Sequence, residues 1–343
     1  MQVEHSDQIE FAKLADIALA GTHNGLSARL NQLQFKWLTE GIHAEGTFCY
    51  LTFKDGQPTQ DEFAEFIYKK IIEFCLPRTY IRECRQKLTD TGDTRWFFEP
   101  VDKAKALFIK AKEKNSKSGE PGEVVLFTLL EGILGAPKIV SKMYLKTNAN
   151  MEVYGSDAIH IKYDPENEIL NVYWGESKLY QELPKALTSI LESVKNFRSY
   201  NEKIAGIQRD FDINIIRNHP DIDCPDAQKT REALAAFLDP YNHQYNNIKE
   251  IHACLAICDT DLYKQLSGTP EVIEQTFKSK YLEEIQSACD LFIKKIMSNK
   301  LEHLRFHFFL LPVNDTADFR KRFCLKVGLP YDKPPKMTKK TNP

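Results

Sequence analysis

Residues 155–178 read GSDAIHIKYDPENEILNVYWGESK, and this stretch decides the expected fold. Two runs rich in strand-forming residues, 155–163 and 169–179, flank the segment 164–168. That segment, Asp-Pro-Glu-Asn-Glu, has the composition of a turn. The stretch therefore predicts an antiparallel β-hairpin, in which successive side chains point to opposite faces.

Charged residues gather at one end of the predicted hairpin. In the second strand, Glu176 and Lys178 continue the face on which Trp174 lies. With the loop at 164–168, counting back from the turn places Asp157 opposite about Gly175, within one residue of Glu176. Directly opposed strand residues have Cβ atoms about 5 Å apart, so the two carboxylates are expected to meet.

Two neighbouring carboxylates need a cation, because without one they repel each other and one is driven toward protonation. Hard oxygen ligands of this kind suit Mg²⁺ or Mn²⁺. Lys178 would then orient the attacking water or stabilise the charge that builds up on a phosphate. Asp157, Glu176 and Lys178 are thus the predicted catalytic residues, and the first two are predicted metal ligands.

The arrangement of Asp157, about 18 intervening residues and then Glu176-Ser-Lys178 resembles the PD-(D/E)xK phosphodiesterase superfamily. Its usual proline before the aspartate is Ser156 here. A Glu-x-Lys tripeptide alone is common. A surface hairpin with an incidental Glu/Lys pair is therefore the structural alternative.

The helix predicted at 123–134 offers a third acid. Glu123 shares its apolar stripe with Phe127 and Leu130, so it could be an additional metal ligand and catalytic residue. The alternative is an ordinary first-turn acid that the helix dipole favours. Glu131, on the same stripe, is a second possibility.

Basic residues nearby are candidates for DNA contacts. Lys142 and Lys146, in the strand predicted at 138–146, could face phosphate groups. His160 lies on the face opposite Asp157 by parity, and we expect it to pack rather than to bind.

The hydrophobic periodicity predicts an α/β (α+β) fold with a mixed sheet. From 120 to 217 the expected order is α-β-β-β-α-β, with helices at 123–134 and 182–204 and strands at 138–146, 155–163, 169–179 and 211–216. After Pro220 the sequence predicts helices at 226–239, 245–265, 271–299 and 315–327, with a strand at 303–313. The expected division is an N-terminal accessory α/β region at 1–115, a nuclease core at 116–220, a mostly helical region at 221–329 and a disordered tail at 330–343.

The chain of 343 residues has an ordinary soluble composition, with 46 basic against 48 acidic side chains and a net charge of −2. It shows neither an apolar run long enough to span a membrane nor a signal peptide, so a cytoplasmic protein with reduced thiols is expected. Near-neutral charge means that DNA binding needs a local basic patch or a partner chain. The sequence contains no GxxxxGK[ST], GxSxG or HExxH pattern, which argues against helicase activity and against other common hydrolases.

Three segments, GEVVLFTLLEGILGAPKIV (122–140), GSDAIHI (155–161) and LNVYWGESKLY (170–180), resemble the HamA family of the bacterial Hachiman anti-phage defence system. The resemblance implies a PD-(D/E)xK restriction-endonuclease-like core and a Mg²⁺-dependent deoxyribonuclease. It also implies a superfamily 2 helicase partner, HamB, that restrains the nuclease until foreign or damaged DNA is engaged. The alternative function is a catalytically inactive DNA-binding or adaptor subunit of such a helicase complex.

Overall fold

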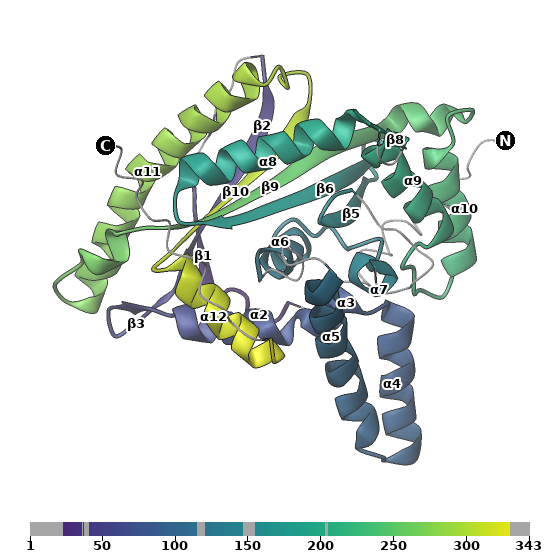
Figure 1. Cartoon of the computed structure of the whole chain (residues 1–343), viewed down its shortest axis with the longest axis horizontal. Coiled ribbons are helices and arrows are strands. Elements are labelled where there is room, and N and C mark those ends of the chain that lie inside the picture. Colours follow the sequence, from purple (N-terminus) through teal and green to yellow (C-terminus); the bar gives the residue numbers. More distant parts are fainter. Residues whose placement is uncertain are drawn as a thin grey trace, which may run out of the picture.

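The computed structural model describes residues 23–35, 37, 41–114, 121–146, 155–202 and 205–329. A six-stranded sheet lies at its centre, in the order β1-β2-β10-β9-β6-β5 (Figure 1). The strands are β1 (Leu30–Leu33), β2 (His43–Leu51), β5 (Ala158–Asp164), β6 (Ile169–Tyr180), β9 (Ile248–Asp259) and β10 (Arg305–Val313). The two outer pairs, β1/β2 and β5/β6, are antiparallel, and the inner neighbours are parallel. The predicted mixed α/β class is confirmed.

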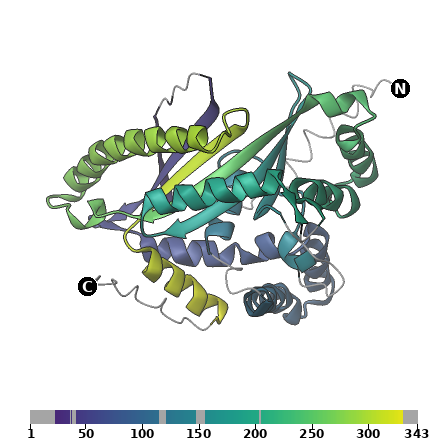
Figure 2. The same ribbon diagram turned by 45° about the horizontal axis from the view of Figure 1, so that its top comes forward.

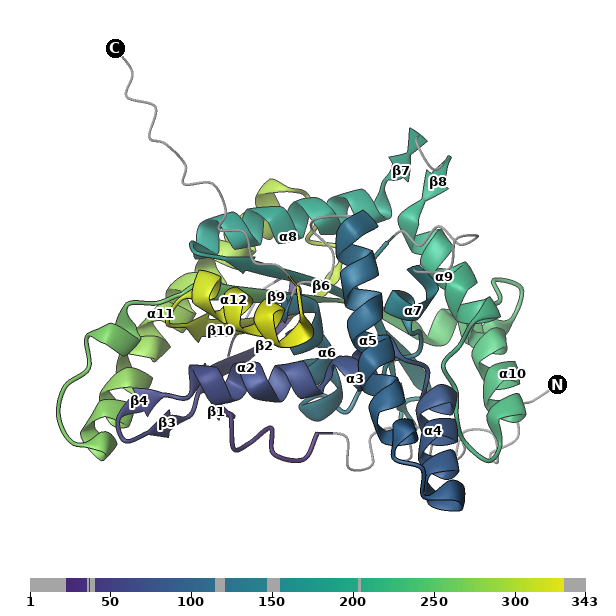
Figure 3. The same cartoon turned by 60° about the horizontal axis from the view of Figure 1, so that its bottom comes forward.

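Helices cover both faces of the sheet. One face carries α8 (Leu183–Arg198) and α11 (Pro270–Ser298), and Figure 2 shows α8 crossing β6 and β9. The other face carries α2 (Gln60–Lys69), α6 (Pro121–Gly132) and α12 (Thr316–Val327) (Figure 3). The further helices are α3 (Ile71–Cys75), α4 (Arg78–Thr91), α5 (Arg95–Lys114), α7 (Lys142–Lys146), α9 (Gln208–Asn218) and α10 (Ala227–Leu238). Short paired strands complete the fold: β3 (Phe53–Lys54) with β4 (Gln57–Pro58), and β7 (Tyr200–Asn201) with β8 (Gly206–Ile207).

The central strand β9 corrects the helix predicted at 245–265. β9 pairs in parallel with β6 on one side and with β10 on the other, and Ala253 to Cys258 are buried. A strand buried on both faces is a continuous apolar run without the alternation that marks an ordinary strand. The region 221–329, expected to be mostly helical, therefore also supplies the two strands β9 and β10.

The strand predicted at 211–216 is also wrong, because these residues belong to α9. Asp212, Ile213 and Ile216 are buried there, at spacings that put them on the inner face of a helix. The alternation Asp-Ile-Asn-Ile imitates a half-buried strand, so periodicity alone favours the wrong element.

The strand predicted at 138–146 is present only as one bridge. Lys138 pairs with His160 of β5, and the chain then turns into α7. The expected order α-β-β-β-α-β is therefore replaced by α6, α7, β5, β6, α8 and α9, with β9 as the strand that returns to the sheet beside β6.

The other elements predicted between 120 and 329 are present. The hairpin, the helices α6, α8, α10, α11 and α12, and the strand β10 lie within a few residues of the expected ranges, although α8 ends at Arg198 rather than near 204. One sheet combines strands from 1–115, 116–220 and 221–329. The tail predicted at 330–343 lies outside the described residues.

Candidate functional site

The hairpin register places Asp157 next to Glu176. Ala158 at the start of β5 pairs with Gly175 of β6, and the backbone N–H of Asp157 donates to the Gly175 carbonyl over 2.8 Å. The next opposed pair along the hairpin is therefore Asp157 and Glu176. The sequence-based register was one residue short, because the turn occupies 165–168 and Asp164 pairs with Ile169.

The turn itself has a local cause. Asp164 Oδ1 accepts hydrogen bonds from the backbone N–H groups of Glu166 (3.1 Å) and Asn167 (3.3 Å), as in an Asx turn. Glu168 has a positive φ of 54°, which closes the loop into β6. These short-range contacts fix the register and so determine which residues meet at the far end of the hairpin.

Ser177 fixes the carboxylate of Asp157. Asp157 Oδ2 accepts a hydrogen bond from the Ser177 backbone N–H over 2.9 Å and another from its hydroxyl over 3.2 Å. The peptide group that holds Asp157 thus belongs to the residue between Glu176 and Lys178. Sequence reasoning did not identify Ser177, because a serine at this spacing carries no signal of its own.

Glu176 and Lys178 form an ion pair, and their side chains are 13% and 23% exposed. Burial and the nearby charge of Asp157 raise the pKa of Glu176 to about 7, although the ammonium of Lys178 opposes the shift. Burial lowers the pKa of Lys178, but the charges of Glu176 and Asp157 outweigh it and leave that pKa above its usual range. Lys178 is therefore a fixed positive charge at neutral pH.

A cavity of about 270 Å³ opens beside the two carboxylates. Its lining combines the acids with aromatic and uncharged polar side chains: Asp157, Trp174, Glu176, Ser193, Asn196, Phe197, Gln208 and His252. His252 Nε2 accepts a hydrogen bond from Arg198 Nε over 3.2 Å, and burial together with the Arg198 charge lowers the pKa of His252 to about 3. The imidazole is thus neutral, and the acidic pair supplies the negative charge of this cavity.

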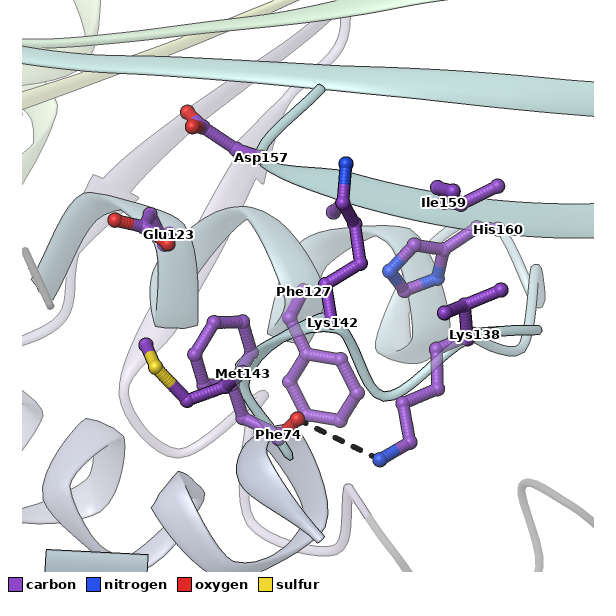
Figure 4. Close-up of a pocket in the computed structure, with 11 residues that line it drawn as sticks. Phe74, Glu123, Phe127, Lys138, Lys142, Met143, Asp157, Ile159 and His160 are labelled. Atoms are coloured by element: carbon purple, nitrogen blue, oxygen red, sulfur yellow. Dashed lines mark hydrogen bonds between the residues drawn. The ribbon is translucent and has the colours of Figure 1, made fainter. Parts of the chain in front are cut away.

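Glu123 lies on the other side of Asp157. The two residues share a water-sized cavity whose lining also includes Lys142 and His160 (Figure 4). Figure 4 shows Glu123 projecting from α6 and Asp157 from the chain just before β5. Glu123 is 5% exposed, so it is a buried first-turn acid rather than a solvated one.

The donor set fits a hard divalent cation at Asp157 and Glu176. Two opposed carboxylates, one with a pKa raised by burial and by the other's charge, are the kind of pair that a cation stabilises. Over the described ranges, no group of three His, Cys, Asp or Glu residues comes together as a metal site. The structure thus places Asp157 opposite Glu176, and Glu123 lines a cavity with Asp157.

One of the two lysines predicted to contact DNA, Lys142, is buried rather than exposed. Lys142 is 4% exposed, and its Nζ lies 2.8 Å from Asp212 Oδ1 in a buried ion pair. The side chain of Lys146 lies outside the described residues. His160 packs as expected: it is 1% exposed, and its Nδ1 lies 2.7 Å from the Ala136 carbonyl oxygen.

Close packing of α6 positions the hairpin. A Cβ atom built at Gly175 would lie 2.9 Å from Leu126 Cδ2 of α6 and 2.9 Å from the Ala158 Cβ. A Cβ at Gly122 would lie 3.3 Å from Ser177 Oγ. Glycine at these two positions lets the first turns of α6 approach the strand that carries Glu176.

Comparison with protein-family models shows which family the chain belongs to. The family model described as HamA matches residues 30–325, which is most of the chain. The search of curated proteins found no match to the chain. None of the helices in the described ranges has the length and apolar character needed to cross a membrane. The chain therefore belongs to the HamA family, and this membership indicates a component of the Hachiman anti-phage defence.

Proposed function

We propose that this member of the HamA family is a metal-dependent deoxyribonuclease that hydrolyses DNA phosphodiester bonds. The observation that carries the proposal is the placement of Asp157 opposite Glu176, with Lys178 on the next position of the same strand face. Asp157 and Glu176 would hold a Mg²⁺ or Mn²⁺ ion. When bound, the ion supplies positive charge against the phosphate oxygens and helps to activate water.

The residues of this chain have separate tasks in the proposed reaction. Asp157 is held to the backbone of Ser177, so its carboxylate is positioned before substrate arrives. Lys178, kept protonated by its two acidic neighbours, stabilises the negative charge that builds up on the phosphate. Because Lys178 remains charged, it acts as an electrostatic group rather than as a general base.

Glu176 links binding of the cation to release of a proton. Its pKa of about 7 means that the free protein keeps this carboxyl partly protonated at neutral pH. A divalent cation at the site favours the ionised form, so the proton leaves when the cation binds. Loading the site therefore shifts Glu176 from the partly protonated form to the charged form.

A partner chain is part of the proposal. The net charge of −2 gives the whole molecule no general attraction for DNA. Membership in the HamA family supports a complex with a helicase subunit that delivers DNA, in the cytoplasm. The helicase would then control when DNA reaches the cavity beside Asp157 and Glu176.

The direct test is Mg²⁺-dependent cleavage of plasmid DNA by purified wild-type and Lys178→Ala protein, with and without the helicase partner. We expect cleavage by the wild type and a large loss in the variant. A folded wild-type protein that binds DNA with its partner but cleaves none, with either Mg²⁺ or Mn²⁺, would support the inactive adaptor instead.

A further inference from the structure

We propose that Asp212 of α9 is a positioning residue for Asp157. The inference rests on the proposed function, since it concerns the loop that presents the metal-binding carboxylate. Asp212, Lys142 and Ser156 form a buried group, called here the Asp212 cluster. Their exposed fractions are 0%, 4% and 6%.

The Asp212 cluster occupies every polar group of the residue before Asp157. Asp212 Oδ2 accepts from the Ser156 backbone N–H over 3.0 Å and from its hydroxyl over 2.8 Å. The ammonium of Lys142 donates to the Ser156 carbonyl over 2.6 Å and to Asp212 Oδ1 over 2.8 Å. Ser156 is therefore held through its backbone N–H, its carbonyl and its hydroxyl, and these contacts orient the peptide that leads into Asp157.

Gly155 shows how closely the loop wraps around this carboxylate. Its φ is +101°, and a Cβ atom built there would lie 2.5 Å from Asp212 Oδ2. Any side chain would collide with the carboxylate in a backbone conformation that already favours glycine. The loop is thus shaped around Asp212, from Gly155 through Ser156 to the catalytic residue.

Stability alone is a weak reason for this arrangement. A buried ion pair often contributes no more than a well-packed apolar pair of similar volume, because both charges lose their hydration. The Lys142–Asp212 pair also provides a donor and an acceptor at fixed positions, and these orient the loop at Ser156. Groups of this kind behind a metal ligand typically change metal affinity or activity 10–100-fold when they are removed.

The same segment offers a matched control. Lys138, Ser141 and Asp221 form a second buried group, called here the Asp221 cluster. Lys138 Nζ lies 3.4 Å from Asp221 Oδ2, and the Ser141 hydroxyl donates to that oxygen over 2.9 Å. This cluster binds the backbone between α3 and α4, through the Leu76 carbonyl (2.7 Å) and the Arg78 N–H (2.8 Å). It contains the same three residue types, with the Arg78 guanidinium 3.6 Å from Asp221 in addition, and it holds a different part of the chain.

The experiment compares full-length Asp212→Asn with Asp221→Asn. Mn²⁺ binding is measured by isothermal titration calorimetry without DNA, kcat and KM by plasmid cleavage, and Tm by thermal unfolding. We expect Asp212→Asn to lower both Mn²⁺ affinity and kcat about 10–100-fold while KM for DNA changes less than about twofold. Asp221→Asn should lower Tm to a similar extent but leave Mn²⁺ affinity and kcat near wild type.

Equal losses of Mn²⁺ affinity in both variants, or a folded Asp212→Asn protein with unchanged affinity and kcat, would overturn the proposal. If Asp212→Asn does not fold, Ser156→Ala carries the test, with Ser141→Ala as its control, because each removes one hydroxyl from its cluster. If the wild type cleaves no DNA, the proposed nuclease function fails, whereas the Mn²⁺ affinities still decide whether Asp212 positions Asp157.

Discussion

The carboxylate of Asp157 is bound to the peptide N–H of Ser177, over 2.9 Å, at the one position in β6 that lies between Glu176 and Lys178. The first strand of the hairpin is thereby fixed to the second at the site of the proposed chemistry. Because the main donor is a backbone group, this contact survives any side-chain change at Ser177 other than proline. Asp157, Glu176 and Lys178 are thus held in fixed positions relative to one another.

The contact predicts a small effect for Ser177→Ala. The variant loses a 3.2 Å hydroxyl bond but keeps the backbone donor, so the free energy of unfolding should fall by only about 1 kcal/mol. Plasmid cleavage should stay within about one order of magnitude of wild type, since the larger losses follow removal of a preorganised donor. A complete loss of cleavage in a folded Ser177→Ala protein would show that the hydroxyl has a role this structure does not assign.

Lys178→Met should lower the cleavage rate about 10²–10³-fold while Mn²⁺ binding changes little, because it removes an electrostatic group and no ligand. The matched control is Lys185→Met, which removes a Lys–Glu pair whose side chains are 58% and 59% exposed. Such surface pairs contribute about 0–1 kcal/mol, so this control should keep both stability and activity. A cleavage rate equal to that of the wild type in Lys178→Met would contradict the proposed role of Lys178 in stabilising charge on the phosphate.

Gly175→Ala should destabilise the protein. The new Cβ would lie 2.9 Å from both Leu126 Cδ2 and the Ala158 Cβ, and overpacking of this kind costs about 1–3 kcal/mol. Urea unfolding measures the loss. In a double-mutant cycle with Leu126→Ala, the two losses should be less than additive, because the shorter side chain removes one of the two collisions. Strict additivity would mean that α6 does not contact Gly175 as described.

Acid should destabilise the fold through Glu131. Burial raises the pKa of this carboxyl, but the hydrogen bond with His23 and the charge of Arg78 outweigh it and bring the pKa to about 2. Since the folded pKa lies below the unfolded value near 4.5, the stabilisation is complete above about pH 4.5. It is lost as pH falls toward 2, and it amounts to about 3 kcal/mol. Glu131→Gln should therefore flatten the fall in stability between pH 5 and pH 3, measured by urea unfolding at each pH.

The hairpin and its charged end were predictable because the signals are local. Turn composition, strand alternation and the spacing of Asp157, Glu176 and Lys178 are all contained in one stretch of 24 residues. The register was wrong by one residue, since the Asx turn at Asp164 shortens the loop, and the error did not separate Asp157 from Glu176. Family resemblance in the same stretch was confirmed by the match over 30–325.

What could not be predicted depends on contacts between distant segments. β9 is buried on both faces, so nothing in its own sequence distinguishes it from a buried helix. Asp212 lies in a segment whose alternation imitates a strand, and its partner Lys142 is 70 residues away. Lys142 was a candidate for phosphate contacts as part of the strand predicted at 138–146. The fold instead pairs it with a buried acid.

The role of Ser156 also depends on a contact with a distant segment of the chain. In the sequence it was only a departure from the proline that the nuclease motif usually has. In the structure its N–H and hydroxyl both bind Asp212, and proline could supply neither donor. The departure is therefore part of the cluster that holds the loop.

Stability and cleavage measured together in Glu176→Gln test whether Glu176 is a metal ligand of the proposed nuclease. Ionised Glu176 is costly to bury, because its folded pKa of about 7 exceeds the unfolded value near 4.5. At pH 8 without metal, the neutral isostere should therefore raise the free energy of unfolding by about 1–3 kcal/mol. The same variant should cleave no plasmid DNA at any Mg²⁺ concentration, while the wild type shows saturable Mg²⁺-dependent cleavage. A Glu176→Gln protein that cleaves DNA as the wild type does would contradict the role of Glu176 as a metal ligand.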